Sequence, residues 1–285
     1  MRDLATIRDD VHRIRTAIAG TVTPPEPTPP VTPPVVTTAA FRDIQCNVQQ
    51  TDPYVEASAH VRWVLGQGVV VGWNELGTPQ LQALIDNSPG WAHYSGPTKD
   101  SAAVTISWRD DIFELVESGY ERENRGWAHI TPARYILWVL LRHRATGKLY
   151  WRINTHVVHH IEVSGLPRII GAITGQNARA KHHFARLGYR TQILAAQHPV
   201  LGGGDLNVDY LAEKALPPSK RCTWFPYTVL SAVATVLNPN HGTHGGRCID
   251  WTWIAGTGIT LAGEPYVLPH QSSDHNPVRR SVRLT

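Results

Sequence analysis

Residues 201–207, LGGGDLN, carry the most distinctive local signal in the chain. An apolar strand ends in three glycines, after which Asp205 and Asn207 present a carboxylate and an amide two positions apart. Glycine lets a backbone or a ligand approach a strand closely, and sites tend to lie where strands end in polar side chains. In such a place Asp205 could orient a water molecule and Asn207 could hold a phosphate oxygen. The same residues also occur in ordinary turns, where Asp and Asn bind their own backbone.

Two further apolar strands carry an acid. Residues 69–76, VVVGWNEL, deliver Glu75 at the end of a buried strand, and carboxylate oxygens are the ligands that magnesium requires. Most acids in such places are merely solvated. Residues 247–254, RCIDWTWI, place Asp250 inside an apolar and aromatic strand. Because a buried carboxylate is costly without a partner, Asp250 needs a nearby donor, and histidine is the obvious candidate.

A polar loop before the last apolar strand contains an Asp-His pair. Residues 272–278, SSDHNPV, set Asp274 directly beside His275. A carboxylate can fix the tautomer and charge of an imidazole, which suits proton transfer or phosphate binding near neutral pH. The alternative is an Asx-type turn that leads into an edge strand at Pro277.

In their set and order these elements resemble the endonuclease/exonuclease/phosphatase superfamily, the deoxyribonuclease-I-like fold that includes abasic-site endonucleases, inositol polyphosphate phosphatases and neutral sphingomyelinases. The resemblance covers residues 41–285. It is carried by six elements in the order of the family: Asn-Val at Asn47, a strand ending in Glu75, Asn-Thr-His from Asn154 to His156, Gly-Asp-Leu-Asn at Asp205 and Asn207, Ile-Asp-Trp at Asp250, and Ser-Asp-His-Asn-Pro-Val at Asp274 and His275.

The resemblance implies a four-layered α/β sandwich of two packed sheets flanked by helices, with the site at one edge. By this likeness Glu75, assisted by Asn47, holds Mg²⁺ or Mn²⁺, and Asp274 contributes to the same cluster. The family also places an acid, a tyrosine or an arginine from the middle strands near the phosphate. Asp100, Arg109, Arg134 and Tyr135 all lie in that stretch, and the sequence does not choose among them.

The likeness also assigns the remaining catalytic roles. Asp205 would orient or deprotonate the attacking water, while Asn207 and His156 would bind the scissile phosphate. Asp250 would pair with His275, which would serve either as general base or as phosphate ligand. The expected reaction is in-line attack of water on phosphorus.

Short β-rich runs alternate with a few helical ones from Phe41 onward, which predicts a two-sheet sandwich with helices outside it. Helices are expected near 54–66, 78–87 and 168–196. Strands are expected near 41–48, 68–74, 101–108, 112–118, 133–142, 148–156, 199–204, 247–254 and 277–284.

Three parts of the chain are expected: a helix at 1–20, a proline-rich linker at 21–39 and a catalytic domain at 40–285. Apolar residues in the helix recur at spacings of three and four, the pattern of a short coiled coil, so we expect a dimer or trimer through residues 2–19. Packing on another surface is the alternative, because fewer than three heptads are marginal. Proline fixes φ and removes backbone donors, which makes the linker an extended spacer.

Composition is that of a globular protein, with 42% hydrophobic residues and a net charge of +4. This charge permits a polyanionic substrate without demonstrating one. Three cysteines cannot form a closed disulfide framework, although a single Cys222–Cys248 bridge is open. The start of the chain lacks the apolar core of a signal peptide and no membrane span is expected, so the predicted location is cytoplasmic. The Arg- and Ala-rich composition is compatible with an actinobacterial or a phage source, and a phage-associated protein is the alternative.

The sequence therefore predicts a metal-dependent phosphodiesterase, a nuclease by preference, with nucleic acid as substrate. A basic segment at 164–198 could flank the nucleic acid or could be a solvated helix face. Two alternatives remain: a phosphatase or phospholipid phosphodiesterase of the same superfamily, and a non-catalytic module in a larger assembly.

Overall fold

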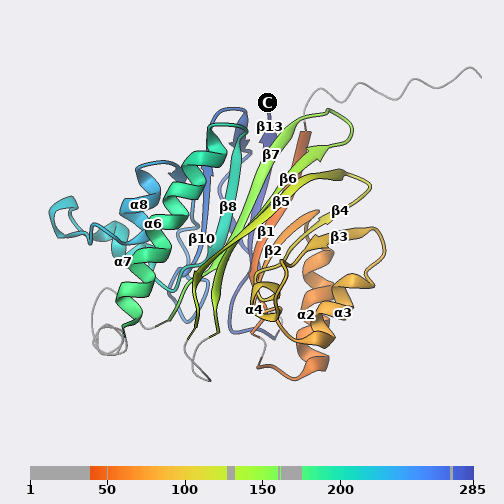
Figure 1. The fold of residues 1–285 in the computed structure, drawn as a ribbon, viewed down its shortest axis with the longest axis horizontal. Coiled ribbons are helices and arrows are strands. Elements are labelled where there is room, and N and C mark those ends of the chain that lie inside the picture. The colour runs from red at the N-terminus through yellow and green to blue at the C-terminus, as the bar shows by residue number, and fades with distance from the viewer. Residues whose placement is uncertain (1–38, 50, 127–131, 160, 162–174, 270–271) are drawn as a thin grey trace, which may run out of the picture. The chain divides into compact units, whose positions relative to one another are not determined.

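Two β-sheets lie face to face between two groups of helices in the computed structural model, which describes residues 39–49, 51–126, 132–159, 161, 175–269 and 272–285. Figure 1 shows the four layers side by side. One sheet is covered by α2 (Tyr54–Leu65) and α3 (Pro79–Asp86). The other is covered by α6 (Gln176–Ala195), α7 (Tyr210–Ala215) and α8 (Pro226–Ser231). The four-layered α/β sandwich expected from the sequence is confirmed.

The first sheet has the strand order β11-β13-β1-β2-β4-β3, with β12 added on β13. Its central strands β1 and β2 are parallel and set Asn47 opposite Asn74 at their ends. The strands are β1 (Ala39–Asn47), β2 (Val70–Asn74), β3 (Trp91–Tyr94), β4 (Ile106–Arg109), β11 (Ile259–Leu261), β12 (Tyr266–Val267) and β13 (Val278–Leu284).

The second sheet has the order β5-β6-β7-β8-β10-β9. Its parallel pair β7 and β8 sets His156 opposite Asp205, and antiparallel β10 sets Asp250 opposite Asp205. The strands are β5 (Phe113–Asn124), β6 (Arg134–His143), β7 (Leu149–His156), β8 (Val200–Asp205), β9 (Thr235–Val236) and β10 (Asp250–Ala255).

A buried ionic cluster joins the inner faces of the two sheets. Asp43 of β1 accepts from Arg152 Nε of β7 at 2.7 Å and from Arg280 Nε of β13 at 3.0 Å. All three side chains are buried. Arg280 Nη1 also donates to the carbonyl of Gly202 in the opposite sheet at 2.6 Å. Burial lowers the pKa of Arg280 to about 10, so the guanidinium stays charged at neutral pH.

The glycine run before Asp205 serves this packing. A Cβ atom on Gly203 would collide with the Gln45 side chain beside the ionic cluster. One on Gly202 would collide with the Trp253 ring, and one on Gly204 would meet the backbone of the neighbouring strand. Glycine is therefore needed here for close approach of protein groups rather than of a ligand.

Some predictions need correction. The strand expected at 101–108 begins only at Ile106, because residues before it form the short helix α4 (Lys99–Ala102). Thr98 and Ser101 bind each other's backbone in a capping box, which starts a helix at this point. The short elements α7, α8, β3, β9, β11 and β12 were not expected. The helix at 1–20 and nearly all of the linker at 21–39 lie outside the described residues.

All three cysteines are free thiols. Among the described helices, none is long and apolar enough to cross a lipid bilayer.

Asp43→Asn should strongly destabilise the protein, since two buried guanidiniums would lose their counter-charge. We expect a loss on the order of 3–5 kcal/mol in the free energy of unfolding, measured by urea denaturation. Asp111→Asn is the matched control, because Asp111 pairs with Arg109 at the exposed surface and such pairs contribute about 0–1 kcal/mol. Equal, small losses in both variants would contradict the role given to the cluster.

Candidate active site

Polar side chains gather where the parallel strands of both sheets end. Asn47 ends β1 and Glu75 follows β2, while His156 and Asp205 end β7 and β8. Asp250 begins antiparallel β10 and so lies at the same edge. This edge is opposite to the end where the chain terminates, because Leu284 pairs with Ala39 at the far end of β1.

Asp205 is the centre of the cluster. Its Oδ1 accepts from the Asn207 backbone N–H at 3.0 Å, and its Oδ2 accepts from Asn47 Nδ2 at 3.0 Å. The Nε2 atoms of His156 and His275 lie 3.4 and 3.9 Å from the same Oδ2. Burial raises the pKa of Asp205 to about 7, with the charge of His275 opposing the shift. The carboxyl group thus has a proton affinity suited to exchange near neutral pH.

Asn47 links Asp205 to the second carboxylate of the site. Its Nδ2 lies 3.2 Å from Glu75 Oε1, while its Oδ1 accepts from the backbone of Gln49. In this arrangement the Asn47 amide nitrogen, and not its oxygen, faces the two acids. Glu75, His156 and Asp205 each bring one side-chain polar atom within 4.8 Å of the other two, and the oxygens of the two carboxylates are ligands that fit a divalent cation.

Backbone strain is concentrated at this edge. Within the described residues, three that are not glycine have positive φ: Gln49 at 55°, Glu75 at 62° and Asn207 at 54°. Glu75 and Asn207 are themselves candidate site residues. Gln49 contacts another one, because its Oε1 accepts from the backbone N–H of Asp274 at 2.8 Å. Left-handed backbone costs free energy for such residues and tends to persist where surrounding contacts hold it for function.

His156 is held in one tautomer by an arginine. Arg134 Nη1 lies 3.1 Å from His156 Nδ1, and because a guanidinium only donates, Nδ1 must accept and Nε2 carries the proton. Burial, with Arg134 and His275, lowers the pKa of His156 well below its ordinary value, so the ring is neutral. Arg134 Nε is buried and has no hydrogen-bond partner among the described residues.

The four candidate phosphate contacts from the middle strands lie in different parts of the fold. A pocket of about 280 Å³ is lined by Glu75, Asp100, Arg134 and His156, among others. Arg109 instead lines a pocket at the opposite end of the sandwich. Tyr135 belongs to the apolar core between the sheets. Arg134 and Asp100 are thus the two candidates at the site.

The Asp250–His275 contact is present. His275 Nδ1 lies 2.8 Å from Asp250 Oδ2. Burial lowers the pKa of His275, but Asp250, Asp205 and Asp274 outweigh it and raise that pKa to about 10. The ring is therefore a cation at neutral pH, held by a buried carboxylate.

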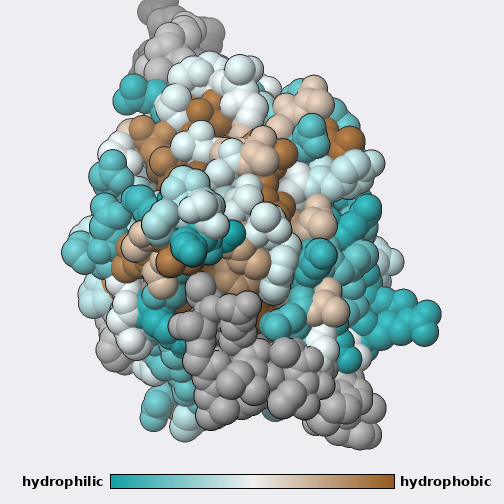
Figure 2. Space-filling view, turned by 90° about the vertical axis from the view of Figure 1, so that its left-hand side faces the viewer, coloured by the Kyte–Doolittle hydropathy of each residue, from teal (hydrophilic) through white to brown (hydrophobic). Residues whose placement is uncertain are grey.

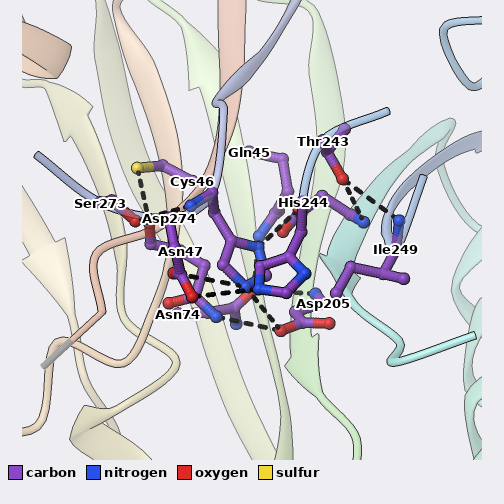
Figure 3. A network of polar contacts seen from close by, with 12 residues as sticks. Gln45, Cys46, Asn47, Asn74, Asp205, Thr243, His244, Ile249, Ser273 and Asp274 are labelled. Carbon is purple, nitrogen blue, oxygen red and sulfur yellow. Dashed lines mark hydrogen bonds and ion pairs between the residues drawn. The ribbon is translucent and has the colours of Figure 1, made fainter. Parts of the chain in front are cut away.

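Two histidine side chains flank the Asp274 carboxylate. Its Oδ2 lies 3.0 Å from Nε2 of His244, and its Oδ1 lies 4.0 Å from His275 Nε2. It forms a group with these two histidines, and His275 and Asp205 connect this group to the one that contains Glu75. Figure 3 shows His244 between Asp274 and the Asp205 side of the site. His244 was missed because nothing in the sequence pattern of its loop distinguishes it from a turn residue.

Asn74 was also missed, although it directly precedes Glu75. Its Oδ1 accepts from Gln45 Nε2 and from the Asp205 backbone N–H, both at 2.8 Å, and its Nδ2 donates to the Thr155 carbonyl at 3.0 Å. An amide in a buried strand must find partners, and that requirement was the available signal. Asn154 has a similar role, since its Nδ2 donates to the Trp73 carbonyl across the sandwich at 2.6 Å.

Residues 175–198 are the described part of the basic segment at 164–198, and they form only partly a charged face. Arg186 and Arg190 of α6 both pair with Glu121 of β5, and His183 is fully buried against Thr155. Figure 2, which looks onto the side that carries α6, shows hydrophobic residues interspersed among hydrophilic ones. These residues of α6 therefore have structural partners.

No protein-family model matches the sequence, and no curated protein matches it. Solved structures do match the fold. An endonuclease/exonuclease/phosphatase from Bacteroides vulgatus superimposes with a TM-score of 0.65 at 16% identity, over 87% of this chain and 100% of that chain. A mannosyl-6-phosphatase from Bacteroides thetaiotaomicron superimposes with a TM-score of 0.61 at 16% identity, over 85% of this chain and 99% of that chain. D. rerio TDP2 complexed with single-strand DNA product superimposes with a TM-score of 0.59 at 14% identity, over 86% of this chain and 99% of that chain. The chain therefore has the deoxyribonuclease-I-like fold of the endonuclease/exonuclease/phosphatase superfamily.

Proposed function

We propose that this chain is a divalent-metal-dependent phosphodiester hydrolase, and more narrowly a nuclease, that acts by in-line attack of water on phosphorus. The surroundings of Asp205 carry the proposal. Its Oδ2 shares the Asn47 amide with Glu75 and faces the Nε2 atoms of His156 and His275. A carboxylate to activate water, a second for a cation and imidazoles for the phosphate are the groups that this reaction needs.

Glu75 would hold Mg²⁺ or Mn²⁺, with Asn47 orienting its carboxylate and the Asp205 carboxylate within reach. Such an ion, when bound, polarises a phosphoryl oxygen and offsets the negative charge that develops there. Asp205 would orient the attacking water and accept its proton, and a pKa of about 7 suits this task. The Asn207 N–H and the Asn47 amide fix the direction of that carboxylate.

The phosphate would be bound by groups whose hydrogens the fold has already directed. His156 is neutral and presents Nε2–H, because Arg134 occupies its other nitrogen. His275 is cationic because Asp250 holds its Nδ1, and its Nε2 faces the site. Arg134 contributes charge from the wall of the pocket. Asn207, whose Nδ2 donates one hydrogen to the Val157 carbonyl at 3.1 Å, would offer the second hydrogen of its amide. Donors fixed in advance lower the free energy of a transition state in which negative charge grows.

Two other functions fit the same fold. A phosphatase or phospholipid phosphodiesterase would share the metal site and differ in the surrounding loops. The structural likeness to a mannosyl-6-phosphatase keeps this alternative open. A non-catalytic module is disfavoured by the complete set of Glu75, Asp205, Asp250 and His275 at one edge.

Purified protein should cleave plasmid DNA, single-stranded DNA or RNA with Mg²⁺ and not with EDTA, and Asp205→Asn should lower the rate about 10²- to 10⁴-fold because the water loses its base. Asp111→Asn, exposed at the opposite end of the sandwich, is the matched control and should cut like the parent. Turnover of phosphoinositides or sphingomyelin alone would support the second enzyme. No turnover of any of these substrates would favour the non-catalytic module.

Arg134→Met should reduce kcat/KM about 10²- to 10³-fold, the effect of removing one fixed donor from a developing oxyanion. The comparison variant is Arg109→Met, which removes an arginine of the neighbouring stretch that lies far from the site. Steady-state kinetics on a short oligonucleotide would decide the point. An equal loss in both variants would show that Arg134 has no special part in the reaction.

A further inference from the structure

A two-residue hairpin brings His244 to the rim of the site. The His244 and Arg247 backbones bond each other in both directions at 2.9 Å, and the two residues between them, Gly245 and Gly246, have φ of 52° and 83°. Positive φ at both central positions is the signature of the tight turns that join antiparallel strands. The hairpin then docks on the Asp-His loop, since the Asn276 N–H donates to the Thr243 carbonyl at 2.7 Å.

This geometry fixes the hydrogen of His244. Arg247 Nη2 lies 3.0 Å from His244 Nδ1, and a guanidinium has no acceptor. Nδ1 must therefore accept, which puts the proton of the neutral ring on Nε2. That atom lies 3.0 Å from Oδ2 of Asp274, so His244 donates to one chosen oxygen of the carboxylate.

We propose that His244 is a positioning residue for the divalent cation, which acts by holding Asp274. The inference rests on the proposed metal dependence. Asp274 has an exposed side chain, so it would sample several rotamers if nothing held it. The backbone N–H of Asp274 donates to Gln49, and His244 donates to Oδ2. The other carboxylate oxygen, Oδ1, therefore faces His275 and the site. A carboxylate ordered in this way loses less entropy when it meets a cation or its water shell.

The His244 ring has a second contact that must be separated from the first. It packs on the His275 ring with centroids 4.6 Å apart. His244→Phe keeps an aromatic ring at this place and removes the N–H donor. His244→Gln removes the ring and keeps a nitrogen donor near the position of Nε2. The two variants therefore divide ring packing from hydrogen bonding.

The experiment measures Mn²⁺ binding to the full chain, without substrate, by electron paramagnetic resonance. His244→Phe should raise the Kd about 10- to 100-fold, the usual effect of losing a hydrogen bond to a metal-binding carboxylate. His244→Gln should stay close to the parent. His241→Phe, a change of the same kind at an exposed position in the same loop, is the control and should leave the Kd unchanged.

Three results would overturn the proposal: an unchanged or lower Kd in His244→Phe, equal losses in the Phe and Gln variants, or no Mn²⁺ bound by the parent. Glu75→Gln, measured alongside, should lose most of the Mn²⁺ binding and so identifies the site being titrated. The binding experiment uses no phosphoester, so it is independent of cleavage. A parent protein that binds Mn²⁺ but cleaves no substrate would refute the proposed function. The role of His244 in Mn²⁺ binding would then still be decided by the His244 variants.

Discussion

The pairing of Asp43 with Arg152 and Arg280 is the constraint on which the interior depends, because it places one carboxylate and two guanidiniums where water cannot reach them. Such a cluster requires every remaining donor to find an acceptor. The carbonyls of Gly202 and Ile44 and the side chain of Gln45 supply these acceptors. The separation and offset of the two sheets are thereby tied to the reach of two arginine side chains.

The same network continues to the active site. Gln45 accepts from Arg152 and donates to Asn74, which in turn accepts from the Asp205 backbone N–H. A chain of hydrogen bonds therefore runs from the ionic cluster to the central carboxylate. Asp205 is positioned from inside the sandwich as well as by its neighbours at the surface. This explains why the glycines before it, which make room for these groups, matter as much as the acid itself.

The sequence was sufficient for features that depend on the order of elements along the chain. Glu75, His156 and Asp205 were expected at strand ends, and parallel pairing brings such ends to one edge of the sandwich. It was insufficient where a role depends on what lies across the fold. Arg134 could be chosen over Arg109 only once the start of β6, which carries Arg134, and the end of β4, which carries Arg109, were seen to lie at opposite ends of the sandwich. His244 and Asn74 take their meaning from partners 30 and 131 residues away.

The site can form only when the strands pair in the correct register. His156 faces Asp205 and Asn47 faces Asn74 because β7 and β8, and β1 and β2, are paired at particular positions. Successive side chains in a strand point to opposite faces, so a slip of one residue would turn these groups away from one another. A chain that had collapsed with its strands shifted could be compact, helical and soluble and still contain no site. Recovery of function after denaturation would thus report correct strand alignment, which measurements of compactness or helix content do not detect.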